Sequence, residues 1–198
     1  MIKAENTPKL TTESLILRKF TYTDLEHFYT IFKDDEVTTF MPWYSLKSLE
    51  EAKGFYERKF KSVYENAAGY HYAICLKENN IPIGYIKANI EEPYDFGYGL
   101  KKEYWGQNIV VEAGKTLLAK LKENGFPYVT ATHDVHNSRS GSVLKKLGFS
   151  YKYTYQKWWQ PKNILVDFRM FQLNFGDNGH VYKGYWDQFA IRYIEEDV

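Results

Sequence analysis

The clearest pattern in the chain is a stripe of apolar residues that recurs with the period of an α-helix. A tight polar turn, residues 104–108, precedes this stripe, and residues 96–100 have the composition of a strand that contains glycines. Gly125 and Pro127 follow the stripe and predict where the helix ends. The stripe consists of Val110, Ala113, Gly114, Leu117, Leu118 and Leu121. The segment therefore predicts a strand, a short loop and a helix in succession.

A strand that leads through a short loop into a helix N-terminus favours the binding of an anion. The first amide groups of a helix have no partner within the helix, and they point outward at the positive end of the helix dipole. Gly106 lets a phosphate approach the backbone of the loop closely. We therefore expect a phosphate-binding site here, with the rest of the chain arranged around it.

Three further helices are predicted from spacing and from capping residues. The first follows Asp24, which we expect to be its N-cap. The second covers residues 48–64 and opens with a capping box, because Glu51 follows Ser48 by three positions. The third covers residues 137–147 and ends before a glycine.

Alternating and continuous apolar runs predict seven strands. Three of them follow one another with short links, which indicates an antiparallel meander, and a later pair is connected by a helix. The predicted class is α+β, with a mixed, mostly antiparallel sheet flanked by helices. The predicted strands cover residues 13–20, 70–77, 83–90, 95–100, 128–132, 149–159 and 164–175.

The end of the chain is set apart from the predicted domain. We expect one domain over residues 1–175 and a C-terminal extension, residues 176–198, that packs on the same domain. The extension would cap the sheet, support a subunit contact or close the substrate site, and the chain would be a monomer or a homodimer. The aromatic loop 40–44 is either a packed linker or one wall of that site. In the extension, helical spacing relates Trp186, Phe189, Ala190 and Tyr193.

Composition narrows the class of protein. The 198 residues are 44% hydrophobic and 26% charged, as in a globular domain, and a net charge of +1 does not indicate a nucleic-acid partner. Because we find neither a signal peptide nor a long apolar run, we expect a cytoplasmic protein without membrane contact. The single cysteine, Cys75, lies in an apolar strand and is interpreted as an inert thiol. His133, Asp134 and His136 are too crowded to indicate a metal site, and we expect no metal.

Three stretches match one family pattern in the family's order and at its spacing. Residues 12–18 read TESLILR, which matches TERLxLR. Residues 104–107 read YWGQ, and Glu112 follows as in YWGxGxxxEA. Residues 137–149 match NxxSxxxLxKLGF. Over roughly residues 11–173 the chain is similar to GNAT-superfamily N-acetyltransferases, in the branch that acetylates the N-termini of ribosomal proteins (RimJ/RimL-like).

The resemblance implies acetyl-CoA as the cosubstrate and a primary amine, on a small molecule or a protein N-terminus, as the acceptor. The pyrophosphate of coenzyme A would lie on the amides of the loop, and its pantetheine arm would run along residues 97–100 like an added strand. One free amide of a splayed strand would polarise the thioester carbonyl. The implied cofactor-binding residues are Tyr98, Gly99, Leu100, Gly106, Gln107, Asn108, Ile109, Val110 and Asn137.

Direct attack of the amine on the thioester needs few groups, and the resemblance suggests some of them. Ser140 resembles the hydroxyl that protonates the departing thiolate in this branch. Asp95, at the start of the strand before the loop, is the candidate general base, and His71, Asp134 or a water chain are alternatives. Glu112 is interpreted as a structural carboxylate at the positive end of the helix.

The chain departs from the family pattern in the loop. The family's second glycine is replaced by Asn108, which tolerates a left-handed backbone better than most residues, and Val110 adds bulk near the expected phosphate. Residues 157–160 of the last hairpin contain no carboxylate. These departures support an alternative, a non-catalytic acyl-CoA-binding or interaction module with a degenerate phosphate loop. Asn137 also has two compatible interpretations, as an N-cap and as a ligand of pantetheine.

Overall fold

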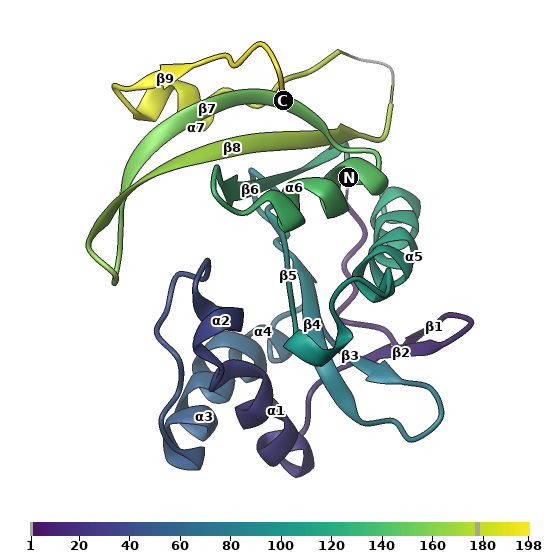
Figure 1. Ribbon diagram of the computed structural model, residues 1–198. Helices are drawn as coiled ribbons and strands as arrows, with labels where there is room; N and C mark the ends of the chain where they lie inside the picture. Colours follow the sequence, from purple (N-terminus) through teal and green to yellow (C-terminus); the bar gives the residue numbers. More distant parts are fainter. Residues whose placement is uncertain (1, 177–178) are drawn as a thin grey trace.

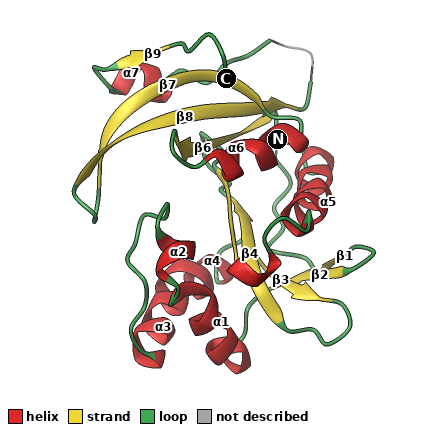
Figure 2. Ribbon diagram, in the orientation of Figure 1, coloured by secondary structure: helices red, strands yellow, loops and turns green. Residues whose placement is uncertain are grey.

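The computed structural model describes residues 2–176 and 179–198, so that Met1, Asp177 and Asn178 lie outside the described residues. The strands of the described residues form two antiparallel sheets, drawn in yellow in Figure 2. The first sheet, in spatial order, contains β1 (Leu10–Thr11), β2 (Leu15–Arg18), β3 (Tyr70–Leu76), β4 (Pro82–Ala88) and β5 (Phe96–Leu100). The second, in spatial order, contains β6 (Tyr128–Asp134), β8 (Ile164–Asn174), β7 (Ser150–Trp159) and β9 (Arg192–Tyr193).

Helices cover both faces of the first sheet (Figure 1). An N-terminal layer contains η1 (Tyr22–Asp24), α1 (Leu25–Phe32), α2 (Asp35–Thr38), α3 (Leu49–Tyr56), the π-helical η2 (Glu57–Lys61) and α4 (Ser62–Tyr64). The other face packs against α5 (Ile109–Glu123) and α6 (Ser138–Lys146), and the turn η3 (Lys102–Tyr104) precedes α5. The predicted helix over residues 48–64 is present as α3, η2 and α4 in succession. No helix in the described part of the chain is long and apolar enough to cross a bilayer.

The side chains of β3 show how one strand serves both layers. Successive side chains of a strand point to opposite faces, so Tyr70, Tyr72 and Ile74 lie in the core formed with α5. Ala73 and Cys75 lie in the second core, formed with α1 and α3. Because both faces are covered, β3 reads as a nearly continuous apolar run rather than an alternating one. A buried aromatic or branched aliphatic side chain contributes about 1.5–3 kcal/mol here.

The two sheets meet at one pair of residues among those described. Asp95, just before β5, and Thr130 of β6 form an isolated parallel bridge. Past this bridge β6 pairs with β8, and β5 pairs only with β4. The predicted α+β class and the mostly antiparallel arrangement are confirmed, and parallel pairing in the described residues is limited to this bridge and an isolated one between Asn6 and Gly69. The edge of β5 that faces β6 therefore stays unpaired from Phe96 to Leu100.

Two predicted helix starts have different outcomes. Asp24 occupies the N-cap position of α1, but its side chain does not cap the helix, because its carboxylate accepts hydrogen bonds from the Arg18 guanidinium at 2.7 and 2.9 Å and from the Thr21 amide at 2.8 Å. The guanidinium binds both carboxylate oxygens and carries a full positive charge, so the carboxylate turns back toward β2. Ser48 caps α3 as predicted, since its hydroxyl accepts a hydrogen bond from the Glu51 amide at 3.1 Å.

The C-terminal extension contains a short helix, α7 (Gly184–Gln188), followed by β9, which pairs with β7. The helical spacing of the sequence extends to Tyr193, whereas the helix ends earlier and Tyr193 lies in a strand. The aromatic side chains of the extension pack against the second sheet instead. Tyr155 of β7 stacks on Tyr185 and on Phe189, with ring centroids 4.9 Å apart in both pairs.

Glu195 attaches the end of the extension to the second sheet. Its carboxylate accepts hydrogen bonds from the Arg169 guanidinium, the shorter at 2.5 Å, and from the hydroxyl of Thr154. Its amide donates to the Tyr151 hydroxyl at 3.0 Å. The hydrogen bond from Arg169 is the largest cause that holds the pKa of Glu195 below its usual value, against the opposing effect of burial.

Replacing Glu195 with Gln is expected to lower the free energy of unfolding by about 1–3 kcal/mol at neutral pH, because Arg169 loses a charged partner. A carboxyl with a lowered folded pKa contributes stability above its unfolded pKa, about 4.3, and this contribution is lost as the pH falls through the folded pKa. Urea denaturation at pH 7 and at about pH 3 measures both effects. Glu196→Gln is the control, and an equal loss at both pH values would contradict the ion pair.

Candidate functional site

The unpaired edge of β5 presents free amide groups. The Asn89 amide donates to the Asp95 carbonyl at 3.0 Å, and the Lys101 amide donates to a carbonyl of β4 at 2.9 Å. Residues that bond to a neighbouring antiparallel strand alternate with residues whose backbone groups point the other way. The amides of Tyr98 and Leu100 therefore point away from β4, toward the side where β6 has diverged.

The loop between β5 and α5 is held in the conformation that an anion site needs. Gly106 and Asn108 both adopt positive φ, at 78° and 57°, which bears out the expectation that Asn108 tolerates a left-handed backbone. The Trp105 indole donates to the Leu100 carbonyl at 2.8 Å and fixes the loop on the end of β5. Asn108 does not cap α5, because its side-chain oxygen accepts a hydrogen bond from Lys146 of α6 at 2.9 Å. The first turn of α5 is thus left without a cap from Asn108.

The side chains of the first turn of α5 do not obstruct this backbone. Ile109, Val110 and Val111 are all buried in the core between α5 and the first sheet. Val110 therefore carries its bulk away from the loop, which removes the steric argument for a degenerate site. The amides of this turn, together with those of the loop, are the groups that would hold a phosphate ester.

A chain of hydrogen bonds spans the gap between β5 and α6. The Tyr98 hydroxyl lies 2.8 Å from the Ser140 hydroxyl and 3.1 Å from the Ser140 carbonyl. The side-chain oxygen of Asn137 accepts from the Ser140 amide at 3.2 Å, so Asn137 is the N-cap of α6. Burial raises the pKa of the Tyr98 phenol, so both hydroxyls are protonated at neutral pH. Tyr98 was expected only as a backbone ligand, and its hydroxyl is a second candidate proton donor.

The two faces of β5 differ in chemistry. Tyr98 faces α6, whereas Asp95, Gly97 and Gly99 have the opposite orientation. A Cβ atom at Gly99 would lie 2.4 Å from the ring of Tyr85, which belongs to the N-terminal core. The structure therefore brings Ser140 together with Tyr98 but places Asp95 on the other face of the strand.

Asp95 forms an ion pair with Lys87 of β4, with the carboxylate oxygen 3.5 Å from the ammonium nitrogen. The side chains are 29% and 23% exposed, so both groups are accessible but partly desolvated. Burial raises the pKa of the Asp95 carboxyl above its usual value, and the charge of Lys87 opposes this effect. A carboxylate of raised pKa at the start of an open strand edge is suited to accept a proton.

Glu112 has the structural role predicted for it. Its carboxylate accepts hydrogen bonds from the hydroxyl of Thr12 at 2.5 Å and from the amide and hydroxyl of Ser14 at 2.9 and 2.7 Å. Burial alone would raise the pKa of Glu112, but these hydrogen bonds hold it below its usual value. The first and second motif stretches thus bind each other, and Glu112 is engaged away from the free amides of β5.

The alternative bases have structural partners. His71 Nδ1 lies 3.2 Å from the Lys59 carbonyl, and burial lowers the pKa of His71 to about 4. The Asp134 carboxylate accepts from the His136 amide at 2.8 Å, and His133 Nδ1 lies 2.8 Å from the Asp134 carbonyl. Over residues 2–176 and 179–198, no group of three His, Cys, Asp or Glu side chains is arranged to hold a metal.

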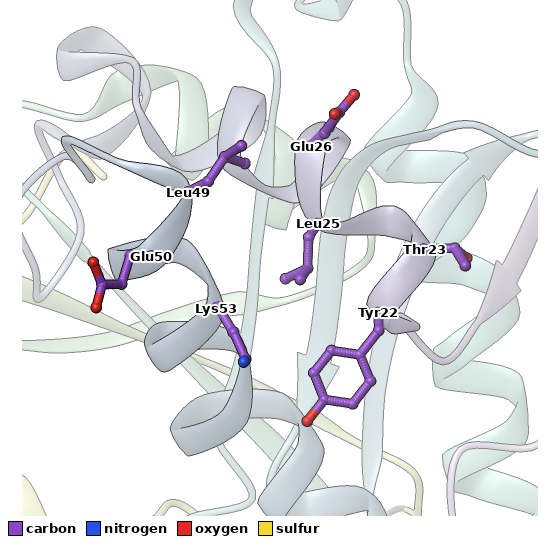
Figure 3. Close-up of a pocket in the computed structure, with 7 residues that line it drawn as sticks. All are labelled: Tyr22, Thr23, Leu25, Glu26, Leu49, Glu50 and Lys53. Atoms are coloured by element: carbon purple, nitrogen blue, oxygen red, sulfur yellow. The ribbon is translucent and has the colours of Figure 1, made fainter.

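A surface pocket elsewhere in the N-terminal layer lies between η1, α1 and α3 (Figure 3). Its side chains include Tyr22 and Leu49, which are largely exposed, and none of them is a predicted site residue. A second surface pocket borders the phosphate loop and includes Gln107, Asn108 and Lys115. The second pocket also includes Glu13, Val111 and Glu112 and no residue of β5, so it borders the loop before α5 and not the open edge of the strand.

Sequence reasoning missed Lys87, the hydroxyl of Tyr98, and two basic residues of α6. Arg139 lies over the Trp105 ring at 4.8 Å from its centre, and Lys146 binds Asn108. The contact between Tyr98 and Ser140 joins residues 42 positions apart, and the periodicity of a helix or strand relates only residues that are close in sequence.

Comparisons with known proteins agree with this geometry. The model of the GNAT acetyltransferase domain matches residues 14–150. The N-acetyltransferase YoaA of Bacillus subtilis, which is uncharacterized, is 27% identical over 147 residues, or 72% of this chain and 82% of that protein.

Solved structures share the fold at lower identity. The microcin C7 self-immunity acetyltransferase MccE, bound to acetyl-CoA and AMP, superposes with a TM-score of 0.72 at 18% identity, over 82% of this chain and 93% of that one. A Vibrio cholerae protein, provisionally named a ribosomal-protein-serine acetyltransferase, has a TM-score of 0.73 at 17% identity, over 86% and 99% of the two chains.

Substitutions at Asn108 test the loop. Asn108→Gly keeps the left-handed turn and is expected to retain coenzyme A binding, with only the Lys146 hydrogen bond lost. Asn108→Val places a β-branched residue at positive φ, which costs about 1–2 kcal/mol of stability and is expected to weaken binding. Thermal unfolding and titration calorimetry with coenzyme A measure the two effects. Equal binding by both variants would show that the left-handed turn does not position the ligand.

Proposed function

The chain belongs to the GNAT acetyltransferase family, and on this premise we propose that it transfers the acetyl group of acetyl-CoA to a primary amine by direct attack. The acceptor is the amine of a small molecule or of a protein N-terminus. The observation that carries the proposal is the unpaired edge of β5, whose free amides at Tyr98 and Leu100 lie beside a helix N-terminus that Asn108 does not cap. Bound acetyl-CoA would supply an acetyl group already activated on sulfur.

Backbone groups would do most of the binding. The amides of residues 106–110 would hold the pyrophosphate, since they lie at the positive end of α5. The edge of β5 from Tyr98 to Leu100 would form hydrogen bonds with the amides of the pantetheine arm. Asn137 would remain the N-cap of α6, at the N-terminus of that helix. Arg139 and Lys146 supply positive charge beside the loop.

The side chains that would accept and donate protons in the reaction lie on opposite faces of β5. The acceptor must lose a proton to become a nucleophile, and Asp95 would accept it, with Lys87 keeping the carboxylate ionised. A nitrogen–carbon bond then forms as the carbon–sulfur bond breaks, and the sulfur needs a proton. Ser140, hydrogen-bonded to Tyr98, would donate that proton on the opposite face and regain one from solvent, to which the acylated nitrogen releases its excess proton.

The alternative of a non-catalytic acyl-CoA-binding module loses much of its support. It was based on Asn108, on Val110 and on the lack of a carboxylate in the last hairpin. The left-handed backbone of Asn108 and the burial of Val110 leave the loop intact, and Asp95 offers a carboxylate elsewhere. Release of free thiol from acetyl-CoA in the presence of a panel of primary amines separates the two functions. Binding of acetyl-CoA without any release would favour the module.

Replacing Ser140 with Ala is expected to lower kcat by about 100-fold, because the sulfur loses its proton donor. Tyr98→Phe should lower kcat less, since the phenol supports Ser140 and can replace it only in part. Thiol release under saturating acetyl-CoA measures both, and calorimetry checks that binding is kept. Ser142→Ala, in the same helix, is the control. Wild-type activity in Ser140→Ala would contradict the assignment.

The pH dependence of activity tests Asp95. If Asp95 accepts the proton, activity is lost as the pH falls through its raised pKa, because the protonated carboxyl is not a base. Lys87→Met removes the charge 3.5 Å away and should move this acidic limb to higher pH, whereas Lys87→Arg should leave it near the wild-type position. The rate of thiol release, measured with one amine over a range of pH, gives the position of the acidic limb. An unchanged limb in Lys87→Met would exclude Asp95 as the base.

A further inference from the structure

The turn between β7 and β8, residues 160–163, is attached to the N-terminal helical layer. The Lys162 ammonium donates hydrogen bonds to the carbonyls of Thr38 and Thr39, each at 2.7 Å. The Tyr44 hydroxyl donates to the Pro161 carbonyl at 3.3 Å. We call these contacts the Lys162 bridge. Figure 1 shows the β7–β8 hairpin reaching from the second sheet toward the N-terminal helices.

Lys162 is well matched to its partners. Thr38 is the last residue of α2 and Thr39 is its C-cap, so their carbonyls lie at the negative end of the helix, where a cation is stabilised. The ammonium also lies 5.3 Å from the centre of the Trp159 ring. A single side chain thus joins segments that are more than 120 positions apart in the sequence.

The bridge lies next to the face of β5 that carries Asp95. Met41, in the same loop as the partners of Lys162, accepts a hydrogen bond from the Tyr85 hydroxyl at 3.2 Å. A Cβ atom at Gly99 would lie 3.1 Å from the end of Met41, so this loop rests directly on β5. The segment that packs on Gly99 is therefore also the segment to which the hairpin is held.

We infer that the Lys162 bridge limits the size of the acceptor, and that the substrate is a slender primary amine such as an alkylamine or arylalkylamine rather than the N-terminus of a peptide. The inference rests on the proposed function, since it concerns the acceptor of the same reaction. A slender amine reaches Asp95 while the bridge is formed. A peptide brings a second backbone and side chains, which need the space that the bridge occupies.

The test compares two acceptors and four proteins. The acceptors are phenylethylamine and an octapeptide without lysine, and the proteins are wild type, Lys162→Met, Lys162→Arg and Lys152→Met at the far end of β7. Wild type should prefer phenylethylamine. Lys162→Met keeps the aliphatic stem but loses the ammonium, so the ratio of kcat/KM for peptide to phenylethylamine should rise at least about tenfold. In Lys162→Arg and Lys152→Met this ratio should stay near the wild-type value. The KM for acetyl-CoA should stay near the wild-type value in all variants.

Amide hydrogen exchange provides a readout that needs no turnover. Residues 39–44 and 160–163 should exchange faster in Lys162→Met than in wild type or Lys152→Met, because the bridge no longer protects them. Unchanged exchange, an unchanged ratio of kcat/KM, or a wild type that acetylates the peptide as readily as the small amine would each overturn the inference. Failure of every protein to release thiol, with faster exchange in Lys162→Met, would count against the proposed function and leave the bridge in place.

Discussion

The site depends on one interruption of backbone pairing, the divergence of β5 from β6 after the Asp95–Thr130 bridge. A buried amide without a partner costs about 1–3 kcal/mol, so a strand edge can remain open only where water or a ligand reaches it. The bridge fixes where the divergence starts, and the hydrogen bonds of the Tyr98 hydroxyl to Ser140 hold α6 beside the open edge. The free amides of β5 are therefore positioned by the packing of both layers.

Successive side chains of β5 point to opposite faces of the strand, so the two faces carry different chemical groups. One face carries Tyr98 toward α6, where its hydroxyl is hydrogen-bonded to Ser140 and burial raises the pKa of the phenol. The other face carries Gly97 and Gly99, because a larger residue at Gly99 would collide with Tyr85, and it begins with the charged Asp95. The strand itself therefore keeps the Tyr98 hydroxyl and the Asp95 carboxyl apart, although the two residues are close in sequence.

Local patterns in the sequence predicted the elements that carry this arrangement, and long-range contacts decided the rest. The apolar stripe of α5, the runs that form the strands and the cap of α6 by Asn137 each depend on residues a few positions apart. The predictions failed where a partner outside the helix competes with the backbone of the helix itself. The Asp24 carboxylate turns to Arg18, and the rings of the extension turn to Tyr155 in the sheet, so the helix expected there ends early. The Lys162 contacts have no local signature at all.

The motifs that carried the family resemblance are largely structural, which explains why two departures within them are tolerated. Glu112 binds Thr12 and Ser14 and so joins two motif stretches, and this contact does not involve the loop itself. Asn108 needs only to adopt a left-handed backbone, which asparagine does at low cost. Val110 needs only to be apolar, because it packs into the core and leaves the first turn of α5 open. The motifs thus fix the framework of the loop and of α5, whereas Asp95 and Lys162, the groups that would activate and select an acceptor, lie outside them.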